Sequence, residues 1–366
     1  MSFYRMGKRL FGLLWPGQRQ SKTTLARTRT PMIHVIILDG TMSSLKPGCE
    51  TNAGRTYRLL SKIGAPVSVF YEAGVQWCDW RSTHHMLMGK GMNRQIKRAF
   101  GYLSSRYRPG DKIFFFGYSR GAYAVRSLAG VIDTVGLLKA DCATERNVEQ
   151  AYRLYQNDAP DDLVEDFAKA HCHKGVEVEM VGVWDTVKAL GLRLPLLWRY
   201  SESSHDFHSH QLGASTKHGF HALALHETRA AFTPVLWDCP KDWNGRVEQV
   251  WFPGAHGDVG GQLGGVNRPR DLANIPLVWM LEKAESCGMP LPEGWQLRYP
   301  QDATARPVGT WSGWGKLFLL RSRRRVGAGV CESLHPSVDA RSMAAGRAPS
   351  LPHVKLPANP SARVAR

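Results

Sequence analysis

Residues 112–125 read KIFFFGYSRGAYAV, and this stretch decides the fold. Its first part, through Phe116, is apolar after the first residue and predicts a buried strand. The strand runs into Gly117, and an apolar helix is expected over Ala122–Val135. Because short apolar runs and helical patterns alternate in the same way along most of the chain, we expect an α/β fold with a mostly parallel sheet and helices on both faces.

The other strands and helices are expected at short apolar runs and at segments with helical periodicity. The strands are 33–38, 67–71, 177–184 and 247–252, and the helices are 52–63, 93–107, 146–156, 161–171, 220–232 and 272–287. After about residue 300 the pattern decays and the chain becomes rich in Pro, Arg and Ala. We therefore predict three parts, which are a basic flexible leader over 1–31, a main domain over 32–300 and a basic, largely disordered tail over 301–366.

The net charge of +17 is concentrated at the two ends of the chain. Residues 1–31 carry a balance of +7 and residues 298–366 a balance of +9, so the residues between them are nearly neutral at +1. A nucleic-acid-binding fold usually carries its positive charge on the docking element itself, and we therefore predict no specific nucleic-acid partner. Basic ends fit a loose attraction to an anionic membrane, and they fit plain solvation equally well.

One stretch near the C-terminal end combines aromatic, aliphatic and basic residues. Trp311, Trp314 and Leu317–Leu320 are followed by the run Arg321-Ser322-Arg323-Arg324-Arg325. Such a pattern can lie on an anionic bilayer surface. The alternative is a packed apolar edge beside a solvated basic face.

Cysteine and histidine usage indicates neither a disulfide scaffold nor a metal site. The seven cysteines are odd in number and form no C-x-x-C pair, so we expect reduced thiols in a cytoplasmic protein. The histidine groups at 171–173 and 205–210 lack the spacing of zinc ligands, and no metal or organic cofactor is expected. No apolar run reaches the roughly 18 residues of a membrane span, and Leu10–Trp15 is too short for a secretory signal. Export by a signal-independent system stays open.

The turn Gly117-Tyr118-Ser119-Arg120-Gly121 has the G-x-S-x-G pattern of a nucleophile elbow, between a strand and a helix. A side chain at either flanking glycine would clash with the neighbouring helix and strand, and the tight turn would direct the Ser119 hydroxyl outward. The Arg120 N–H, at the start of the helix, would then face an oxyanion. The alternative is a strand–turn–helix unit that merely uses small residues.

A nucleophilic serine needs a base, and the base needs an orienting carboxylate. In folds that carry this elbow the order along the chain is Ser, acid, His. Asp185 follows the strand 177–184, and His256 follows the strand 247–252. Because parallel strands deliver their carboxyl ends to one edge of the sheet, we expect Ser119, Asp185 and His256 to meet there.

Three other residues are alternates for these roles. Asp258 is a second candidate for the acid, although holding its Gly-rich loop through backbone N–H groups fits it better. His335 is a second candidate for the base. Asp39-Gly40-Thr41 closes the first strand at the same edge, so either Gly40 or Thr41 supplies a second oxyanion N–H, or Asp39 only anchors the elbow.

These residues resemble the uncharacterised α/β-hydrolase domain family that includes the catalytic domain of type VI secretion Tle-type phospholipase effectors. Four blocks, spread over roughly residues 32–290, carry the likeness, and they are LDGT at 38–41, YRPGD at 107–111 through GYSRGAY at 117–123, VWDTV at 183–187 and VWFPGAHGDVGG at 250–261. The resemblance implies a three-layer α/β-hydrolase-like fold and a serine hydrolase with Ser119, Asp185 and His256 as its triad. It also implies phospholipid acyl esters as substrates.

On this basis we predict a serine ester hydrolase, a lipase or phospholipase that works through an acyl-enzyme. Residues 186–245 are expected to include a cap over the site, with an apolar underside at 190–198 suited to acyl chains. Expected partners are the ester substrate, an anionic membrane surface and a secretion-apparatus or immunity protein. The alternative is a non-catalytic protein of the same fold that binds a membrane surface or a protein partner through its basic ends.

Overall fold

The computed structural model describes residues 29–74, 90–187, 212–239, 245–264, 270–311, 318–327, 329 and 331–345. The described residues from Pro31 onward belong to one compact unit. Most of the predicted leader, the apolar stretch of the predicted cap at 190–198 and the end of the predicted tail lie outside the described residues.

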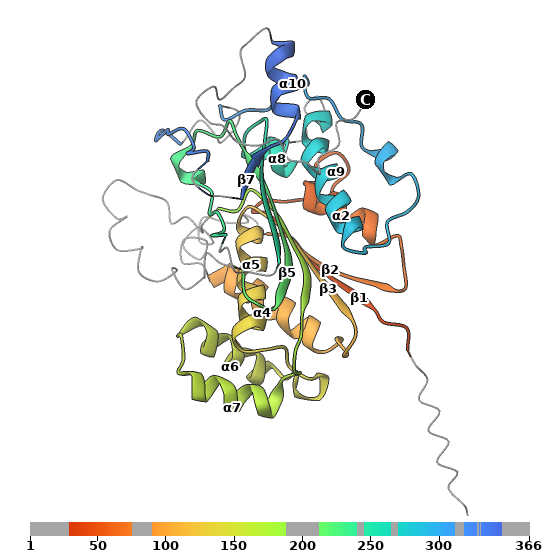
Figure 1. The fold of residues 1–366 in the computed structure, drawn as a ribbon, viewed down its shortest axis with the longest axis vertical. Helices are drawn as coiled ribbons and strands as arrows, with labels where there is room; N and C mark the ends of the chain where they lie inside the picture. The colour runs from red at the N-terminus through yellow and green to blue at the C-terminus, as the bar shows by residue number, and fades with distance from the viewer. Residues whose placement is uncertain are drawn as a thin grey trace, which may run out of the picture. The chain divides into compact units, whose positions relative to one another are not determined.

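The described strands form one seven-stranded sheet in which every neighbouring pair is parallel (Figure 1). Their order is β2-β1-β3-β4-β5-β6-β7. The strands are β1 (Ile33–Leu38), β2 (Val67–Glu72), β3 (Lys112–Tyr118), β4 (Val178–Trp184), β5 (Thr216–Ala224), β6 (Arg246–Phe252) and β7 (Glu332–Leu334). The predicted α/β class is therefore confirmed, and the strand before the elbow, β3, lies inside the sheet between β1 and β4.

Helices cover both faces of the sheet (Figure 1). They are α2 (Asn52–Leu60), α4 (Lys90–Ser104), α5 (Arg120–Thr134), α6 (Glu145–Gln156), α7 (Asp161–His171), α8 (His256–Gly260), α9 (Arg270–Ser286) and α10 (Ser337–Ala344). Short 3₁₀ turns occur at η1 (Ala140–Cys142), η4 (Ala230–Phe232) and η5 (Trp295–Arg298).

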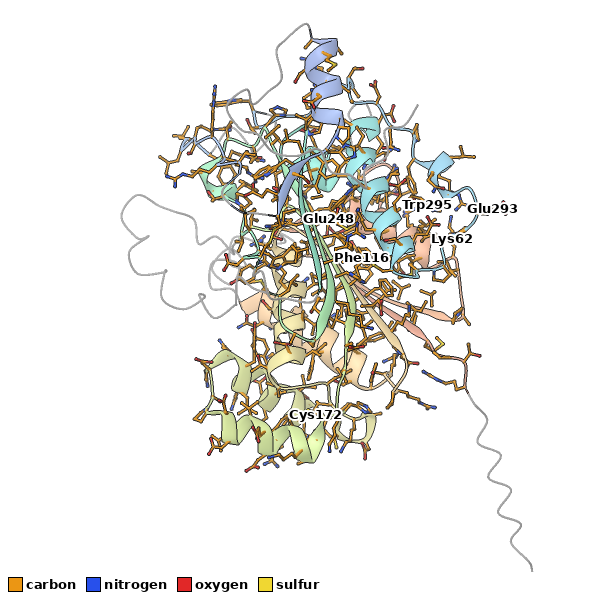
Figure 2. The ribbon with its side chains drawn as sticks, in the orientation of Figure 1. Lys62, Phe116, Cys172, Glu248, Glu293 and Trp295 are labelled. Atoms are coloured by element: carbon orange, nitrogen blue, oxygen red, sulfur yellow. A yellow bond between two sulfur atoms is a disulfide. The ribbon has the colours of Figure 1, made fainter. Side chains whose placement is uncertain are left out.

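The hydrophobic core is divided into two clusters by the sheet, because successive side chains of a strand point to opposite faces. On β1, Ile36 and Leu38 pack in the cluster under α4–α7, whereas Val35 and Ile37 pack in the cluster under α2 and α9. Figure 2 labels Cys172 from the first cluster and Phe116 and Trp295 from the second. Burial on both faces explains why the strands are continuous apolar runs in the sequence.

Two expectations about the elements are wrong. The segment predicted as a helix over 220–232 forms the end of β5 and the turn η4 instead. β5 is hydrogen-bonded to β4 on one side and to β6 on the other, and Gly219–Ala224 are all buried. The predicted boundary at residue 300 is also too early, because β7 joins the sheet beside β6 and α10 follows it.

Two findings bear on the cysteines and on membrane insertion. Cys239 and Cys331 form a disulfide, with Cα atoms 6.2 Å apart, whereas reduced thiols are expected from the sequence. Cys49, Cys142, Cys172 and Cys287 are free. Within the described ranges, no helix is both long enough and apolar enough to cross a bilayer.

Candidate active site

The turn between β3 and α5 holds Ser119 in an unusual backbone conformation. Its φ and ψ are 56° and −119°, a region that residues other than glycine rarely adopt. A Cβ atom at Gly117 would lie 2.6 Å from the Ala122 Cα, and one at Gly121 would lie 2.1 Å from the Leu38 carbonyl oxygen. The two glycines therefore let α5 fold back tightly onto β3 and β1, as the elbow pattern predicts.

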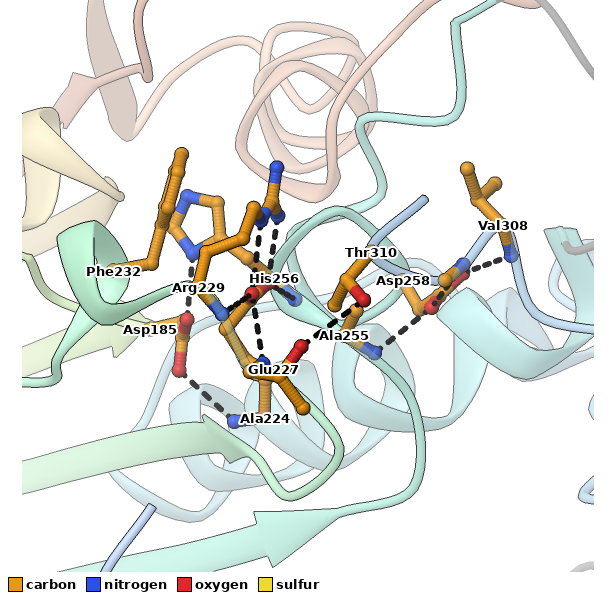
Figure 3. Close-up of polar contacts among 12 residues, drawn as sticks. Asp185, Ala224, Glu227, Arg229, Phe232, Ala255, His256, Asp258, Val308 and Thr310 are labelled. Atoms are coloured by element: carbon orange, nitrogen blue, oxygen red, sulfur yellow. Dashed lines mark hydrogen bonds and ion pairs between the residues drawn. The ribbon is translucent and has the colours of Figure 1, made fainter. Parts of the chain in front are cut away.

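Ser119, His256 and Asp185 lie in one chain of hydrogen bonds at the carboxyl edge of the sheet. The Ser119 Oγ is 2.9 Å from the His256 Nε2, and the His256 Nδ1 is 2.5 Å from the Asp185 Oδ2. Figure 3 shows the second of these contacts. Asp185 directly follows β4, and His256 is the first residue of α8, just after β6. The structure thus brings together the three side chains that the sequence predicts as nucleophile, base and acid.

The Asp185 carboxylate is fully buried and has further donors besides His256. The Ala224 N–H donates to its Oδ1 at 2.9 Å (Figure 3). Arg324 contacts both oxygens, with Nη1 2.5 Å from Oδ1 and Nη2 2.8 Å from Oδ2. Burial alone would raise the pKa of Asp185, but the Arg324 charge and the hydrogen bonds from His256 and Arg324 hold that pKa well below its usual value.

Arg324 is a residue of the site that the sequence does not single out. It belongs to the basic run 321–325, which predicts only a solvated or membrane-facing surface. The one sequence signal is the density of arginines, and it does not say which of them turns inward.

The His256 imidazole packs against aromatic rings, and its backbone N–H contacts a buried ion pair. The rings of Tyr118 and Phe232 lie with their centroids 4.9 and 4.8 Å from that of the imidazole. The backbone N–H of His256 donates to the Glu227 Oε2 at 3.1 Å, and the Arg229 guanidinium pairs with the same carboxylate at 2.6 Å (Figure 3). These contacts fix both the backbone and the ring of His256.

The candidate oxyanion donors differ in whether their N–H groups are already engaged. The Gly40 N–H donates to the Asp39 Oδ1 at 2.7 Å. Among the described residues no acceptor contacts the N–H of Arg120 or of Thr41, and Arg120 opens α5, where N–H groups have no intrahelical acceptor. A Cβ at Gly40 would lie 3.3 Å from the Ser119 Cβ, so this loop runs beside the nucleophile. Of the two loop candidates, Thr41 is the one whose N–H has no acceptor within the part of the chain that the structure describes.

Asp39 and the two other alternates have structural contacts. The Asp39 carboxylate accepts hydrogen bonds from Thr51 at 2.6 Å and Tyr71 at 2.8 Å, and burial raises its pKa to about 6. Asp258 accepts from the backbone N–H groups of 255, 308 and 309, which ties its own loop to a distant segment (Figure 3). His335 stacks on Phe252 at 4.6 Å, and no hydrogen bond joins it to Ser119. The structure therefore does not bring Asp258 or His335 into the hydrogen-bond chain.

The possible metal ligands do not gather into a site in the described part of the chain. No three side chains of His, Cys, Asp or Glu lie together there in a metal-binding group. The histidines at 205–210 lie outside the described residues.

A nucleophile turn after a central strand, with Asp and His after later strands of one parallel sheet, defines the α/β-hydrolase class of fold. Within that class, the chain belongs to the family described as "T6SS, Phospholipase effector Tle1-like, catalytic domain", whose model matches residues 33–283. The predicted resemblance is confirmed.

Three similar proteins extend this comparison. The uncharacterized protein YEL023C of Saccharomyces cerevisiae is 25% identical over 230 residues, which are 56% of this chain and 32% of that protein. The chain thus spans about a third of this curated relative. An uncharacterized protein from Pseudomonas aeruginosa is 16% identical with a TM-score of 0.40, over 76% of this chain and 52% of that one. The Tle1 effector bound to the VgrG spike from the Type 6 secretion system is 14% identical with a TM-score of 0.30. The match covers 75% of this chain and 77% of that one.

Proposed function

We propose that this protein is a serine ester hydrolase of the phospholipase type, with Ser119 as nucleophile, His256 as general base and Asp185 as the acid that orients it. The observation that carries the proposal is the unbroken hydrogen-bond chain from the Ser119 hydroxyl through the imidazole to the buried carboxylate. Membership in a family of phospholipase effector catalytic domains supports the choice of substrate class.

The proposed reaction has two halves. The Ser119 Oγ attacks the acyl carbonyl carbon while the His256 Nε2 takes its proton, and a tetrahedral oxyanion forms. The intermediate collapses as the bond to the leaving alcohol breaks, and His256 returns the proton to that alcohol. Water then attacks the acyl-enzyme with the same base and releases the fatty acid and Ser119. Asp185 keeps its charge throughout and stabilises the imidazolium.

We assign the oxyanion hole to the N–H groups of Arg120 and Thr41. Both are free of other acceptors among the described residues, whereas the Gly40 N–H is engaged by Asp39. The Gln262 side chain donates to the Thr41 carbonyl oxygen at 2.9 Å and so restrains that peptide. In a well-studied protease, one such donor stabilises the transition state by about 3 kcal/mol.

We also propose that the protein contacts an anionic lipid surface through Trp311, Leu319, Leu320 and Arg321, called here the apolar–basic patch. The three apolar side chains are 61%, 80% and 64% exposed, and the Arg321 guanidinium lies 3.9 Å from the centre of the Trp311 ring. Residues 320–322 are hydrogen-bonded to 228–230, the segment that leads to Phe232 beside His256. The patch is therefore attached to the wall of the site.

A secretion-apparatus protein, and an immunity protein that neutralises the activity, are further proposed partners. The support is the family, which is defined by effectors of the type VI system. Export by that signal-independent route would be the corresponding localisation.

The function is tested by fatty-acid release from vesicles of phosphatidylethanolamine and phosphatidylglycerol, together with labelling by a fluorophosphonate probe. Ser119→Ala is expected to lower release by about 10⁴-fold or more and to abolish labelling, because it removes the attacking oxygen. Ser105→Ala, at an exposed serine after α4, is the matched control and should behave as the wild type. A wild-type protein that neither labels nor releases fatty acid would instead support the non-catalytic alternative.

A further inference from the structure

Arg324 reaches from the C-terminal part of the chain into the centre of the site. Its side chain is only 4% exposed, although the neighbouring Arg323 and Arg325 are exposed. Besides the two contacts with Asp185, its Nη1 donates to the Ala224 carbonyl at 2.9 Å and its Nη2 to the Phe232 carbonyl at 2.5 Å. These four hydrogen bonds fix the guanidinium plane against the carboxylate plane.

The Asp185 Oδ2 is shared between two cationic partners during the proposed reaction. It lies 2.5 Å from the His256 Nδ1 and 2.8 Å from the Arg324 Nη2. A triad acid normally offers its full negative charge to the imidazolium that forms. Here part of that charge is already balanced by the guanidinium of Arg324, which contacts both carboxylate oxygens.

We propose that Arg324 is a positioning residue of this site, one that locks the Asp185 carboxylate toward His256 and reduces the negative charge that the base experiences. The inference rests on the proposed function, because it concerns the base of that reaction. Arg324 lies beyond residues 33–283, so the family match does not assign it.

The expected consequence is a pH–rate profile whose acidic limb depends on the charge of Arg324, because that charge lies against the carboxylate that holds the base. The low pKa of Asp185 agrees with this arrangement, since the carboxylate stays charged while it holds the ring. Other titratable groups interact with the pair from the packed elements. Glu227, after β5, interacts with His256, whereas Tyr118 in β3 and His221 in β5 interact with Asp185. The Glu227 charge is paired with Arg229 at 2.6 Å, and Asp258 accepts three backbone N–H bonds. Among the described arginines and lysines, Arg324 is thus the one in direct contact with the acid.

The test is the pH profile of kcat/KM on a soluble short-chain ester, measured from pH 4.5 to 8. Arg324→Met removes the charge but keeps a side chain of similar length, and it should move the acidic limb of the profile to higher pH by about one unit. Arg324→Lys keeps the charge and loses the bidentate contact with the carboxylate, so it should leave the acidic limb of the profile in place and lower kcat by about 10-fold.

Arg298→Met is the matched control, since it removes an exposed arginine that has no hydrogen bond to Asp185 or His256. Its profile should match the wild type.

The outcomes separate the possible roles of Arg324. A folded Arg324→Met protein whose acidic limb stays within about 0.2 units of the wild type overturns the electrostatic part of the inference. A kcat of Arg324→Lys equal to that of the wild type overturns the positioning part of the inference. If Arg324→Met does not fold, the kcat of Arg324→Lys decides the inference by itself. Failure of the wild type to label at Ser119 with the fluorophosphonate would overturn the proposed function itself, which is a different result from an unshifted limb.

Discussion

Gly121 leaves no room for a side chain at the turn that carries Ser119. An added Cβ would lie 2.1 Å from the Leu38 carbonyl oxygen and 2.5 Å from that of Asp39, and neither backbone atom can move aside without disturbing β1. Gly121→Ala should therefore destabilise the protein by about 3 kcal/mol, at the upper end of the usual cost of overpacking, and slow fluorophosphonate labelling of Ser119. Urea unfolding and the labelling rate measure the two effects.

A matched control for this substitution lies in α4. A Cβ at Gly101 would meet the Val148 Cγ2 at 3.5 Å, an ordinary contact, and Gly101 is inside a helix. Gly101→Ala should leave labelling unchanged and raise the free energy of unfolding by about 0.5–1 kcal/mol. Equal stability of the Gly121→Ala and Gly101→Ala proteins would contradict the packing argument for the elbow.

The sequence predicts which three side chains meet at the sheet edge because each of them follows a strand whose pattern is clear. Ser119, Asp185 and His256 are placed by the strands before them, and parallel strands end on the same edge. The choice between Gly40 and Thr41 depends on where the Asp39 carboxylate points, which is decided by tertiary contacts with Thr51 and Tyr71. Local pattern carries no information on such contacts.

Arg324 could not be predicted for a similar reason. It lies 139 residues from Asp185 in the chain, and it has three arginine neighbours within the run 321–325. Only the path of the C-terminal segment across the site distinguishes it from them.

At the scale of elements, β5 shows where periodicity fails. The strand is buried on both faces and flanked by two strands, so its side chains do not alternate between apolar and polar. A short buried run of this kind cannot be told from a buried helix by its pattern alone. By contrast, the predicted strand 33–38 matches β1 at both ends.

The last strand holds the segment that carries Arg324. Glu332 in β7 accepts a hydrogen bond from the Trp251 Nε1 at 2.7 Å and one from the Gly327 N–H at 2.9 Å. Gly327 is only three residues beyond Arg324. The edge strand thus connects the sheet to the segment that reaches Asp185.

The apolar–basic patch is the element whose role a binding experiment can decide. Changing Leu319 and Leu320 together to Glu should lower cosedimentation with phosphatidylglycerol vesicles by about 10-fold or more, because burying each leucine in lipid is worth about 1.5–3 kcal/mol. Vesicle hydrolysis should fall further than hydrolysis of a soluble ester. Leu163→Glu, at a leucine on α7 that is 54% exposed, is the control and should not change binding. Equal binding by both variants would exclude the patch as the lipid contact.

At the scale of the whole molecule, buried histidines make the fold sensitive to acid. His221 is fully buried and accepts a hydrogen bond from the Thr186 N–H at 3.1 Å, and His335 is stacked on Phe252. Burial, with smaller contributions from Arg126 and Lys283 respectively, lowers the pKa of each to about 3. Between about pH 6.5 and 3 the unfolded chain therefore binds protons that the folded protein does not, so stability falls as the pH falls.

These pKa shifts determine how much stability the protein loses in mild acid. At pH 5, His221 and His335 each lower the free energy of unfolding by about 2 kcal/mol relative to pH 7. Asp39 acts in the opposite direction, because its pKa of about 6 lets the folded protein bind a proton at a pH where the unfolded chain does not. It offsets about 1 kcal/mol of the loss. These three groups alone should therefore lower the free energy of unfolding in urea by about 3 kcal/mol between pH 7 and pH 5. His335→Phe, which keeps a ring against Phe252, should remove about 2 kcal/mol of that loss, whereas His171→Asn at the end of α7 should keep it. An undiminished loss in His335→Phe would show that acid sensitivity arises elsewhere in the molecule.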